Sequence, residues 1–221
     1  MPGRVVRAVL FDLDGVLVES REATERVWLA WASANGIGEE ELRSAMHGVR
    51  SLEVVRALRP DSDFEAEAAE VERLQAEDVA GLRAIRGAVD ALHALKEDRV
   101  AVVTSATRAL AAARLGAVGM APPAVMVNAE DVSRGKPDPE GYLAAASRLG
   151  VDPAEALVVE DAPPGVEAGR AAGAAVVGVS STHAAEELSA ADVVIETLED
   201  LPAVLARSFD AAAVLRANGW R

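Results

Sequence analysis

The stretch AVLFDLDGVLVES, residues 8–20, runs from four apolar residues into two aspartates and a glycine. In an extended segment, residues two apart project to the same side, so we expect Asp12 and Asp14 to lie side by side. Two carboxylates about 4 Å apart repel by roughly 4 kcal/mol at an effective dielectric constant of about 20. A bound divalent cation or a raised pKa offsets such repulsion. The stretch therefore predicts a compensated acidic site at the end of a buried strand.

Taken alone, the Asp-x-Asp-Gly sequence also fits simpler structures. A solvated turn or a helix cap explains two closely spaced aspartates about as well as an acidic site does. A calcium-binding loop fits less well, because Val16 and Leu17 stand where further oxygen ligands should be. The rest of the chain has to separate these alternatives.

Apolar runs rich in β-branched residues alternate along the chain with longer, Ala-rich segments of helical spacing. This alternation is typical of βαβ units, which form a parallel sheet with helices on both faces. Two helix starts support it, because Asp138 precedes Pro139 and Asp152 precedes Pro153. We therefore expect an α/β fold built on a Rossmann-like, doubly wound parallel sheet. The expected strands are Val5–Phe11, Val100–Thr104, Ala124–Val127, Ala156–Val159, Ala175–Val179 and Val193–Ile195.

The segment 20–84 interrupts this alternation, because it contains no strand-like run. Its apolar residues recur at helical spacing, and the first such stripe ends at Asn35-Gly36. We expect an all-helical cap domain over residues 19–84. It is inserted into a core domain made of residues 1–18 and 85–221.

The composition limits the classes of function. The chain has 221 residues, of which 26% are charged and 51% hydrophobic, and its formal net charge is −14. A chain of this length can bury a sizeable core, whereas its negative charge argues against nucleic acid and anionic membranes as partners. The absence of cysteine excludes disulfides and thiolate chemistry. Because no apolar run has the length of a membrane helix or a signal peptide, we expect a cytoplasmic protein. Separately, we expect a monomer or a weak homodimer.

Polar side chains follow three other expected strands. AVVTSATR places Ser105 before a helix, where hydroxyl and backbone N–H groups can bind phosphate oxygens. DVSRGKPDPEGY places the cation Lys136 before another helix, and LVVEDAPPGVEAG ends a strand with Glu160 and Asp161, carboxylates of the type that Mg²⁺ prefers. Taken alone, Ser105 fits a helix cap, Lys136 a surface lysine and Glu160 a loop residue. Because the carboxyl ends of parallel strands meet at one edge, together they predict a phosphoryl-transfer site.

The four segments FDLDGVLVES, VVTSATR, GKPDPEGY and VVEDAPPGVEAG resemble the signature motifs of the haloacid dehalogenase superfamily. The helical insertion after the first motif is similar to the small mobile cap of that superfamily. HGVRSLEVV, TSATR and EDAPPGVEAG resemble most the group of sugar phosphatases, glycerol-3-phosphatases and 2-deoxyglucose-6-phosphatases. The resemblance implies hydrolysis of a small phosphorylated metabolite.

The resemblance also implies roles for the acidic residues. Asp12 would be the nucleophile that forms an aspartyl-phosphate, and Asp14 would be the general acid and base. Mg²⁺ would be held by Asp12, the backbone carbonyl of Asp14, and Asp161, with Glu160 binding directly or through water.

The remaining roles concern phosphate and substrate. Ser105, the N–H of Ala106 and Lys136 would hold the phosphoryl oxygens, and Lys136 would also steady the nucleophile. In the cap, His47 and Arg50 lie in MHGVRSLEVV, a polar turn before a helix that would close over the leaving group. The alternative for this turn is a loop with an exposed arginine.

Two other functions stay open. A β-phosphoglucomutase-like enzyme would use the same aspartyl-phosphate, but Thr24 stands near where such relatives carry a cap histidine, which favours a hydrolase. A non-catalytic phospho-accepting domain uses similar residues at strand ends, but it is shorter, lacks a helical insertion and carries its phosphorylated aspartate on a later strand. A non-catalytic binding module would normally lose one of Asp12, Asp14, Lys136 or Asp161, and all four are present. A dehalogenase is disfavoured because that branch lacks the aspartate found here as Asp14.

Overall fold

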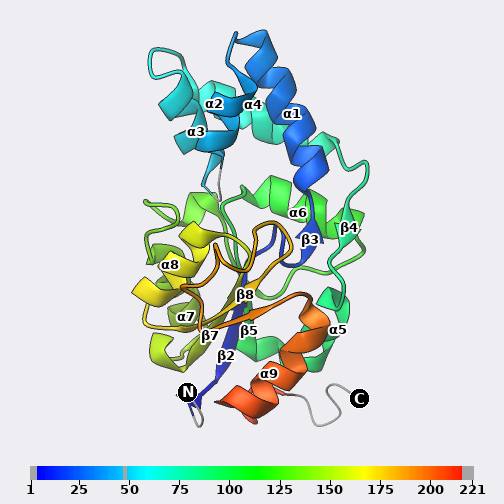
Figure 1. The fold of residues 1–221 in the computed structure, drawn as a ribbon, viewed down its shortest axis with the longest axis vertical. Coiled ribbons are helices and arrows are strands. Elements are labelled where there is room, and N and C mark those ends of the chain that lie inside the picture. The colour runs from blue at the N-terminus through cyan, green and yellow to red at the C-terminus, as the bar shows by residue number, and fades with distance from the viewer. Residues whose placement is uncertain (1–3, 47–48, 216–221) are drawn as a thin grey trace.

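The computed structural model describes residues 4–46 and 49–215, and a six-stranded sheet lies at its centre (Figure 1). Its strands pair in parallel in the order β6-β5-β2-β7-β8-β9. This order confirms the α/β fold expected from the sequence. The strands are β2 (Ala8–Phe11), β5 (Val100–Val103), β6 (Val125–Val127), β7 (Ala156–Glu160), β8 (Ala175–Val179) and β9 (Val193–Ile195).

Helices cover both faces of the sheet because successive residues of each strand point to opposite faces. Val9 and Phe11 face a core shared with α5, α6 and α9, whereas Ala8 and Leu10 face α7 and α8. All residues of β2, β5, β7 and β8 are buried, as expected for strands between two helical layers. These helices are α5 (Ala88–Ala94), α6 (Arg108–Ala117), α7 (Glu140–Leu149), α8 (Pro163–Ala171) and α9 (Leu201–Ser208).

One predicted helix start is confirmed, because Asp152 caps η3, whereas the other lies one residue later than predicted, because α7 begins at Glu140 with Pro139 as its N-cap. Asp138 Oδ1 accepts the backbone N–H of Glu140, the first residue of α7, at 3.0 Å. Asp152 Oδ1 accepts the N–H of Ala154 at 2.9 Å and starts the 3₁₀-helix η3 (Pro153–Glu155). Each aspartate therefore satisfies a backbone donor that the helix itself leaves without a partner.

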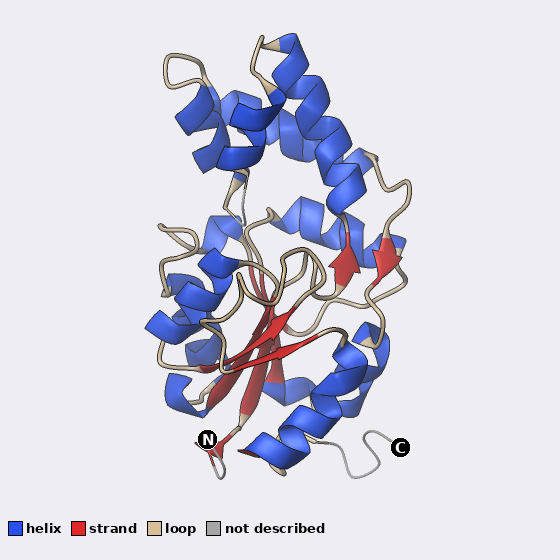
Figure 2. Cartoon of the chain, in the orientation of Figure 1, coloured by secondary structure: helices blue, strands red, loops and turns tan. Residues whose placement is uncertain are grey.

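The helices of the insertion pack together beyond the carboxyl ends of the strands (Figures 1 and 2). They are α1 (Arg21–Ala34), α2 (Glu39–Ala45), α3 (Ser51–Leu58) and α4 (Phe64–Glu77). Their buried apolar residues form a cluster separate from both cores of the sheet, namely Trp28, Ala32, Leu42, Val54, Val55, Ala68 and Val71. The first helix ends before Asn35, and Gly36 has φ +70°, so the chain turns where the sequence predicted. We call this helical layer the cap.

The prediction that the insertion contains no strand was wrong at its ends. β3 (Val18–Glu19) and β4 (Arg83–Ala84) pair antiparallel where the chain enters and leaves the cap. Two-residue strands show no periodicity, so the sequence pattern could not reveal them. The pair holds the two connections between cap and core side by side.

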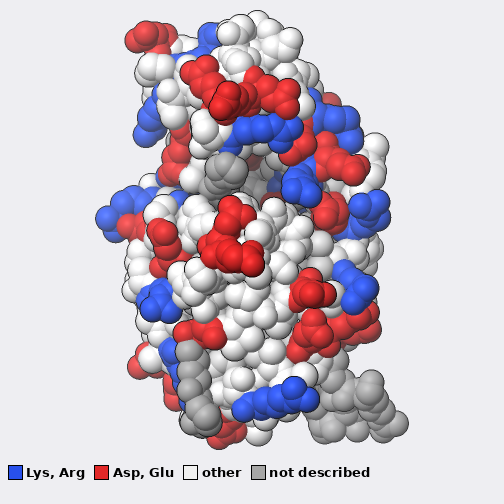
Figure 3. Space-filling model, in the orientation of Figure 1, with Lys and Arg blue, Asp and Glu red and all other residues white. Residues whose placement is uncertain are grey.

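The expected first strand also divides in two. Val5 belongs to β1 (Arg4–Val5), which pairs in parallel with β10 (Phe209–Asp210) outside the main sheet. The remaining short helices are η1 (Glu97–Arg99), η2 (Ala129–Asp131) and η4 (Leu198–Asp200). No helix in the described ranges is long and apolar enough to cross a membrane. Figure 3 shows acidic and basic side chains intermixed on one face of the molecule.

Candidate active site

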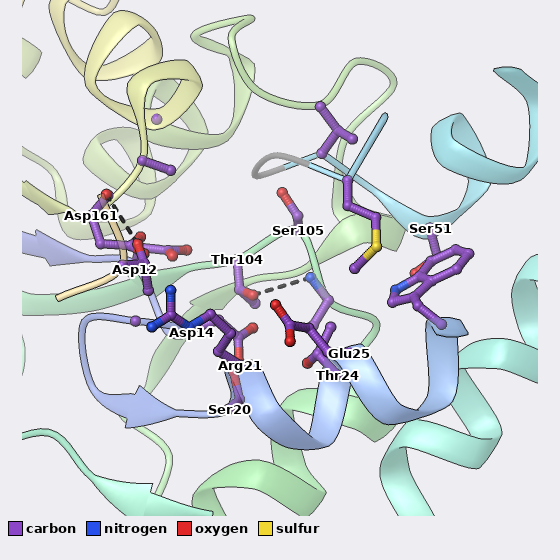
Figure 4. Close-up of a pocket in the computed structure, with 18 of the residues that line it drawn as sticks. Asp12, Asp14, Ser20, Arg21, Thr24, Glu25, Ser51, Thr104, Ser105 and Asp161 are labelled. Carbon is purple, nitrogen blue, oxygen red and sulfur yellow. Dashed lines mark hydrogen bonds between the residues drawn. The ribbon is translucent and has the colours of Figure 1, made fainter. Parts of the chain in front are cut away.

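The parallel sheet brings the predicted strand-end residues together. β2 lies between β5 and β7, so Asp12, Ser105 and Asp161 follow three neighbouring strands at the same edge. The backbone N–H of Asp12 donates to Val159 O at 2.9 Å and extends the pairing of β2 with β7 by one residue. Figure 4 shows Asp12, Asp14 and Asp161 on one side of a pocket whose other side carries cap residues. The site therefore lies between core and cap.

Lys136 is a buried cation beside Asp12. Its Nζ donates to Asp12 Oδ1 at 2.7 Å, to Glu160 Oε1 at 2.5 Å and to Val103 O at 3.3 Å. Burial alone would lower the pKa of Lys136, but the carboxylates of Asp12 and Glu160 outweigh burial and raise it above its ordinary value. The ammonium group therefore stays charged beside the nucleophile that the sequence predicted.

The acidic residues carry more negative charge than Lys136 can balance. The pKa of Asp12 is raised to about 7: burial raises it most, the nearby carboxylates of Glu160 and Asp14 also raise it, and Lys136 offsets part of this rise. Burial, with Glu160 and Asp12 nearby, also raises the pKa of Asp161 well above its ordinary value. A second cation at this place would remove the cost of burying ionised carboxylates.

A metal cation could balance this excess negative charge. Asp12, Glu160 and Asp161 each offer a carboxylate oxygen, and these oxygens lie within 4.8 Å of one another. All three residues are buried, and hard oxygen donors suit Mg²⁺. The geometry thus agrees with a site for a divalent cation that prefers oxygen ligands.

Glu160 also has a second structural role. Its Oε1 accepts from Lys136 and from the buried Tyr142 hydroxyl at 2.7 Å, and its Oε2 accepts the N–H groups of Asp161 at 3.0 Å and Ala162 at 3.4 Å. Both oxygens are therefore already hydrogen-bonded within the protein. Glu160 positions Lys136, while the less engaged oxygens of Asp12 and Asp161 are better placed to bind a metal.

Gly15 allows the loop after β2 to approach Asp161. Its φ is +77°, and a Cβ atom at this position would overlap the Asp161 carboxylate. A glycine is required here because other residues rarely adopt this φ and none has room for its side chain. The loop that carries Asp14 is thereby held against Asp161.

The predicted phosphate-binding residues line the same cavity. Ser105, Ala106 and Lys136 face it together with Asp12. The N–H of Ala106 donates to Thr104 Oγ1 at 3.1 Å, which orders the turn before α6. A bound phosphoryl oxygen could share this donor at the helix start.

Asp14 is held by two side chains. Ser20 Oγ donates to Asp14 Oδ1 at 2.6 Å, and Arg114 Nη1 donates to Asp14 Oδ2 at 2.5 Å. Arg114 Nη2 donates in turn to Thr24 Oγ1 at 2.9 Å and to Gln75 Oε1 at 2.7 Å. The sequence reasoning missed Arg114. The available signal was its place on the apolar stripe of α6, four residues after the buried Leu110.

The cavity between core and cap has a volume of about 450 Å³. Its cap side combines apolar side chains with a polar pair, in which Arg43 Nη1 lies 2.8 Å from Glu25 Oε1. This volume suits a small ligand. The apolar lining from the cap includes Trp28, Leu29, Leu42, Met46, Val49 and Val54.

The two cap residues predicted to contact substrate have different outcomes. Arg50 pairs with Glu53 at 2.5 Å and donates to Val132 O and Ser133 O at 3.2 Å each, so it ties α3 to the loop before Lys136. It does not line the large cavity. His47 lies outside the described residues.

The loop after β8 adds residues that the sequence reasoning did not select. Thr182 donates to Asp161 Oδ2, and His183 Nδ1 lies 2.9 Å from the backbone oxygen of Asp161. Thr182, His183 and Glu187 all line the cavity. No motif marks them, because they reach the site only through the fold of the 180–187 loop.

Comparisons with known proteins support the same reading. The family model of haloacid dehalogenase-like hydrolases matches residues 6–173. Hexitol phosphatase A of Escherichia coli is 39% identical over 200 residues, which cover 88% of this chain and 93% of that protein. Glycerol-1-phosphate phosphohydrolase 2 of Saccharomyces cerevisiae is 33% identical over 213 residues, covering 89% of this chain and 84% of that protein. These matches confirm the resemblance read from the strand-end motifs.

Two further comparisons extend this picture. A crystal structure of a hydrolase from Pseudomonas syringae superposes with a TM-score of 0.78 at 28% identity, covering 90% of this chain and 98% of that one. A beta-phosphoglucomutase of Mycobacterium bovis is 32% identical over 247 residues, covering 89% of this chain and 91% of that protein. The relatives therefore include a mutase as well as phosphatases.

Proposed function

The chain belongs to the haloacid dehalogenase-like hydrolase family, and we propose that it is a magnesium-dependent phosphatase of small sugar or polyol phosphates. The observation that carries the proposal is the buried Asp12 carboxylate, hydrogen-bonded to Lys136 and facing a cavity sized for a small metabolite. Phosphate monoesters react extremely slowly with water, and a covalent intermediate divides that barrier into two smaller ones.

Asp12 and Asp14 share the two chemical steps. In the first, an oxygen of Asp12 attacks phosphorus, the bond from phosphorus to the ester oxygen breaks, and Asp14 gives its proton to the departing alcohol. In the second, Asp14 takes a proton from water, the water oxygen attacks phosphorus, and the bond to Asp12 breaks. Inorganic phosphate leaves, and Asp12 and Asp14 return to their starting forms.

Mg²⁺ would be held by Asp12, Asp161 and the backbone carbonyl of Asp14, with Glu160 direct or through water, and would offset the charge that phosphate brings to this acidic site. The supporting observation is the cluster of carboxylate oxygens within 4.8 Å. Without a cation, a phosphate dianion would meet the unbalanced negative charge described above.

The phosphoryl oxygens would be oriented by Lys136, the Ser105 hydroxyl and the N–H of Ala106. Lys136 is already positioned to bind a phosphoryl oxygen, because its hydrogen bonds to Glu160 and Asp12 hold its Nζ beside the cavity. Fixed donors of this kind stabilise charge that develops during transfer.

The leaving alcohol would lie against the cap. Glu25, Arg43 and Ser51 line that side of the cavity and can exchange hydrogen bonds with sugar or polyol hydroxyls. Trp28 supplies an apolar surface beside them. We therefore expect these residues, rather than Arg50, to select the substrate.

A phosphate-release assay tests the proposal. The purified protein is offered hexitol, hexose and glycerol phosphates, with Mg²⁺ or with a chelator. We expect release with Mg²⁺, almost none in chelator, and none from Asp12→Asn, whereas the exposed control Asp98→Asn should behave like the wild type. Phosphate-ester binding without turnover would support the non-catalytic alternative and refute the enzyme.

A mutase is the second candidate, because a relative that covers most of the chain carries that name. Thr24 argues against a mutase, because it stands near where mutase-like relatives carry a histidine that acts on the sugar. Its hydroxyl accepts a hydrogen bond from Arg114 instead. The assay supplies β-glucose 1-phosphate with a bisphosphate primer and follows two products. Phosphate with glucose supports the phosphatase, and rapid formation of glucose 6-phosphate without phosphate supports the mutase.

A further inference from the structure

Arg114 connects the cap to the catalytic core. It belongs to α6 in the core, and its side chain is only 7% exposed. One nitrogen contacts Asp14, and the other contacts Thr24 of α1 and Gln75 of α4. A single guanidinium group therefore bonds the proposed acid-base residue and two helices of the cap.

The charges around Arg114 divide its contacts into two kinds. Among its hydrogen-bond partners, Asp14 is the charged one, while Thr24 and Gln75 are neutral. The charge of a buried guanidinium is thus balanced by the catalytic carboxylate. The neutral partners fix the orientation of the guanidinium group, because the donors of arginine have a fixed planar geometry. The position of α1 and α4 against α6 consequently determines how the guanidinium group is oriented toward Asp14.

The second bond to Asp14 also comes from the cap junction. Ser20 precedes the first residue of α1 and donates to Asp14 Oδ1. Figure 4 shows Asp14 beside the start of this helix, near Ser20 and Thr24. One carboxylate oxygen of Asp14 is therefore bonded by Ser20, at the start of the cap, and the other by a core arginine that also bonds two helices of the cap.

We propose that Arg114 is a positioning residue that orients Asp14 and makes this orientation depend on the contact between cap and core. The inference rests on the proposed function, because it assigns Arg114 a task in the proton transfers of Asp14. Proton transfer by a positioned side chain contributes about 10²–10⁴-fold, and a small misplacement loses much of it. Loss of Arg114 should therefore resemble a partial loss of Asp14.

The leaving group distinguishes this role from a purely structural one. Glycerol phosphate releases a poor leaving group that needs a proton, whereas p-nitrophenyl phosphate releases a good one that does not. Arg114→Met keeps an unbranched stem in the buried site and removes the guanidinium donors. We expect kcat/KM to fall about 10–100-fold for glycerol phosphate and less than about threefold for the aryl ester. Arg26→Met, which removes an exposed arginine bonded to Asp78, is the matched control and should change neither value by more than about twofold.

A double-mutant cycle tests whether Arg114 acts through Asp14. In the Asp14→Asn background, Arg114→Met should lower the remaining rate by less than about twofold, because the group that it positions is already inactive. Should Arg114→Met fold poorly, the double variant Thr24→Val/Gln75→Leu removes the cap bonds and keeps the charge pair. It should show the same preference for the aryl ester, with a loss of about 3–10-fold on glycerol phosphate.

Equal losses on both esters in these variants, or an undiminished effect of Arg114→Met in the Asp14→Asn background, would overturn the proposal. So would wild-type kinetics in Arg114→Met. A wild-type protein that releases phosphate from neither ester overturns the phosphatase itself, and the positioning role with it. An active wild type with an insensitive Arg114 variant overturns only the role of Arg114.

Discussion

The removal of the buried cation Lys136 should destabilise the protein strongly. Its Nζ lies 2.7 Å from Asp12 and 2.5 Å from Glu160, and the three side chains are 8%, 10% and 1% exposed. Lys136→Met would leave two carboxylates buried without their cation, beside a third in Asp161. Removing one partner of a buried ion pair typically costs about 3–5 kcal/mol. For a domain of this size each kcal/mol lowers Tm by about 2–4 °C, so we expect a decrease of about 6–20 °C.

Thermal unfolding in the presence of a chelator measures this effect. The loss should be larger at about pH 8 than at about pH 5, because protonation relieves the unpaired carboxylates. The double variant Lys136→Met/Asp12→Asn should recover part of the stability by removing one of these charges. Lys96→Met, which removes an exposed lysine bonded to Ala213 O, should shift Tm by no more than about 2 °C. A Lys136→Met protein that unfolds as the wild type does at the higher pH would refute the buried ion pair.

Three further predictions concern the same cluster. The folded-state pKa of Asp12 is about 7, above its unfolded value, so the metal-free folded protein binds more protons than the unfolded chain. The free energy of unfolding should therefore fall by up to about 4 kcal/mol between about pH 4 and pH 7. A flat pH profile in chemical denaturation would contradict this. A Cβ atom at Gly165 would collide with the Glu160 carboxylate, so Gly165→Ala should cost about 1–3 kcal/mol in urea unfolding, whereas Gly116→Ala, with open space around it, should be neutral or stabilising. Asp161→Asn should remove most of the rise in Tm that Mg²⁺ gives the wild type, and an unchanged rise would place the metal elsewhere.

The sheet and its catalytic edge were predictable because their signals are local. Buried parallel strands read as continuous apolar runs, and a residue just after such a run lies at the carboxyl edge wherever the strand sits. Asp12 and Asp161 each follow such a run, so the sequence predicts both at this edge, whereas Lys136 lies in the loop between β6 and α7 and meets Asp12 only through the fold. Their approach to within hydrogen-bond or metal-binding distance follows from the strand order around β2.

The contacts between cap and core were not predictable in this way. Arg114 reads as a helix residue of α6, whereas its polar partners come from the loop after β2, from α1 and from α4, all distant from it in the sequence. Arg50 reads as a substrate-binding residue in a polar turn, yet its guanidinium bonds the Val132 and Ser133 carbonyls of the core. Such pairings between cap and core join residues 39 to 90 positions apart, and no periodicity records them.

The most direct test of the central claim is to trap the phosphorylated enzyme. The Asp14→Asn variant is mixed with p-nitrophenyl phosphate and Mg²⁺, quenched in acid within the first turnover, and its peptides are mapped by mass spectrometry. Because this ester needs no acid to leave but the intermediate needs a base to hydrolyse, the variant should accumulate one phosphoryl group on Asp12. A phosphoryl group on another residue, or a burst of p-nitrophenol with no phosphorylated peptide, would contradict the assignment of Asp12 as the nucleophile.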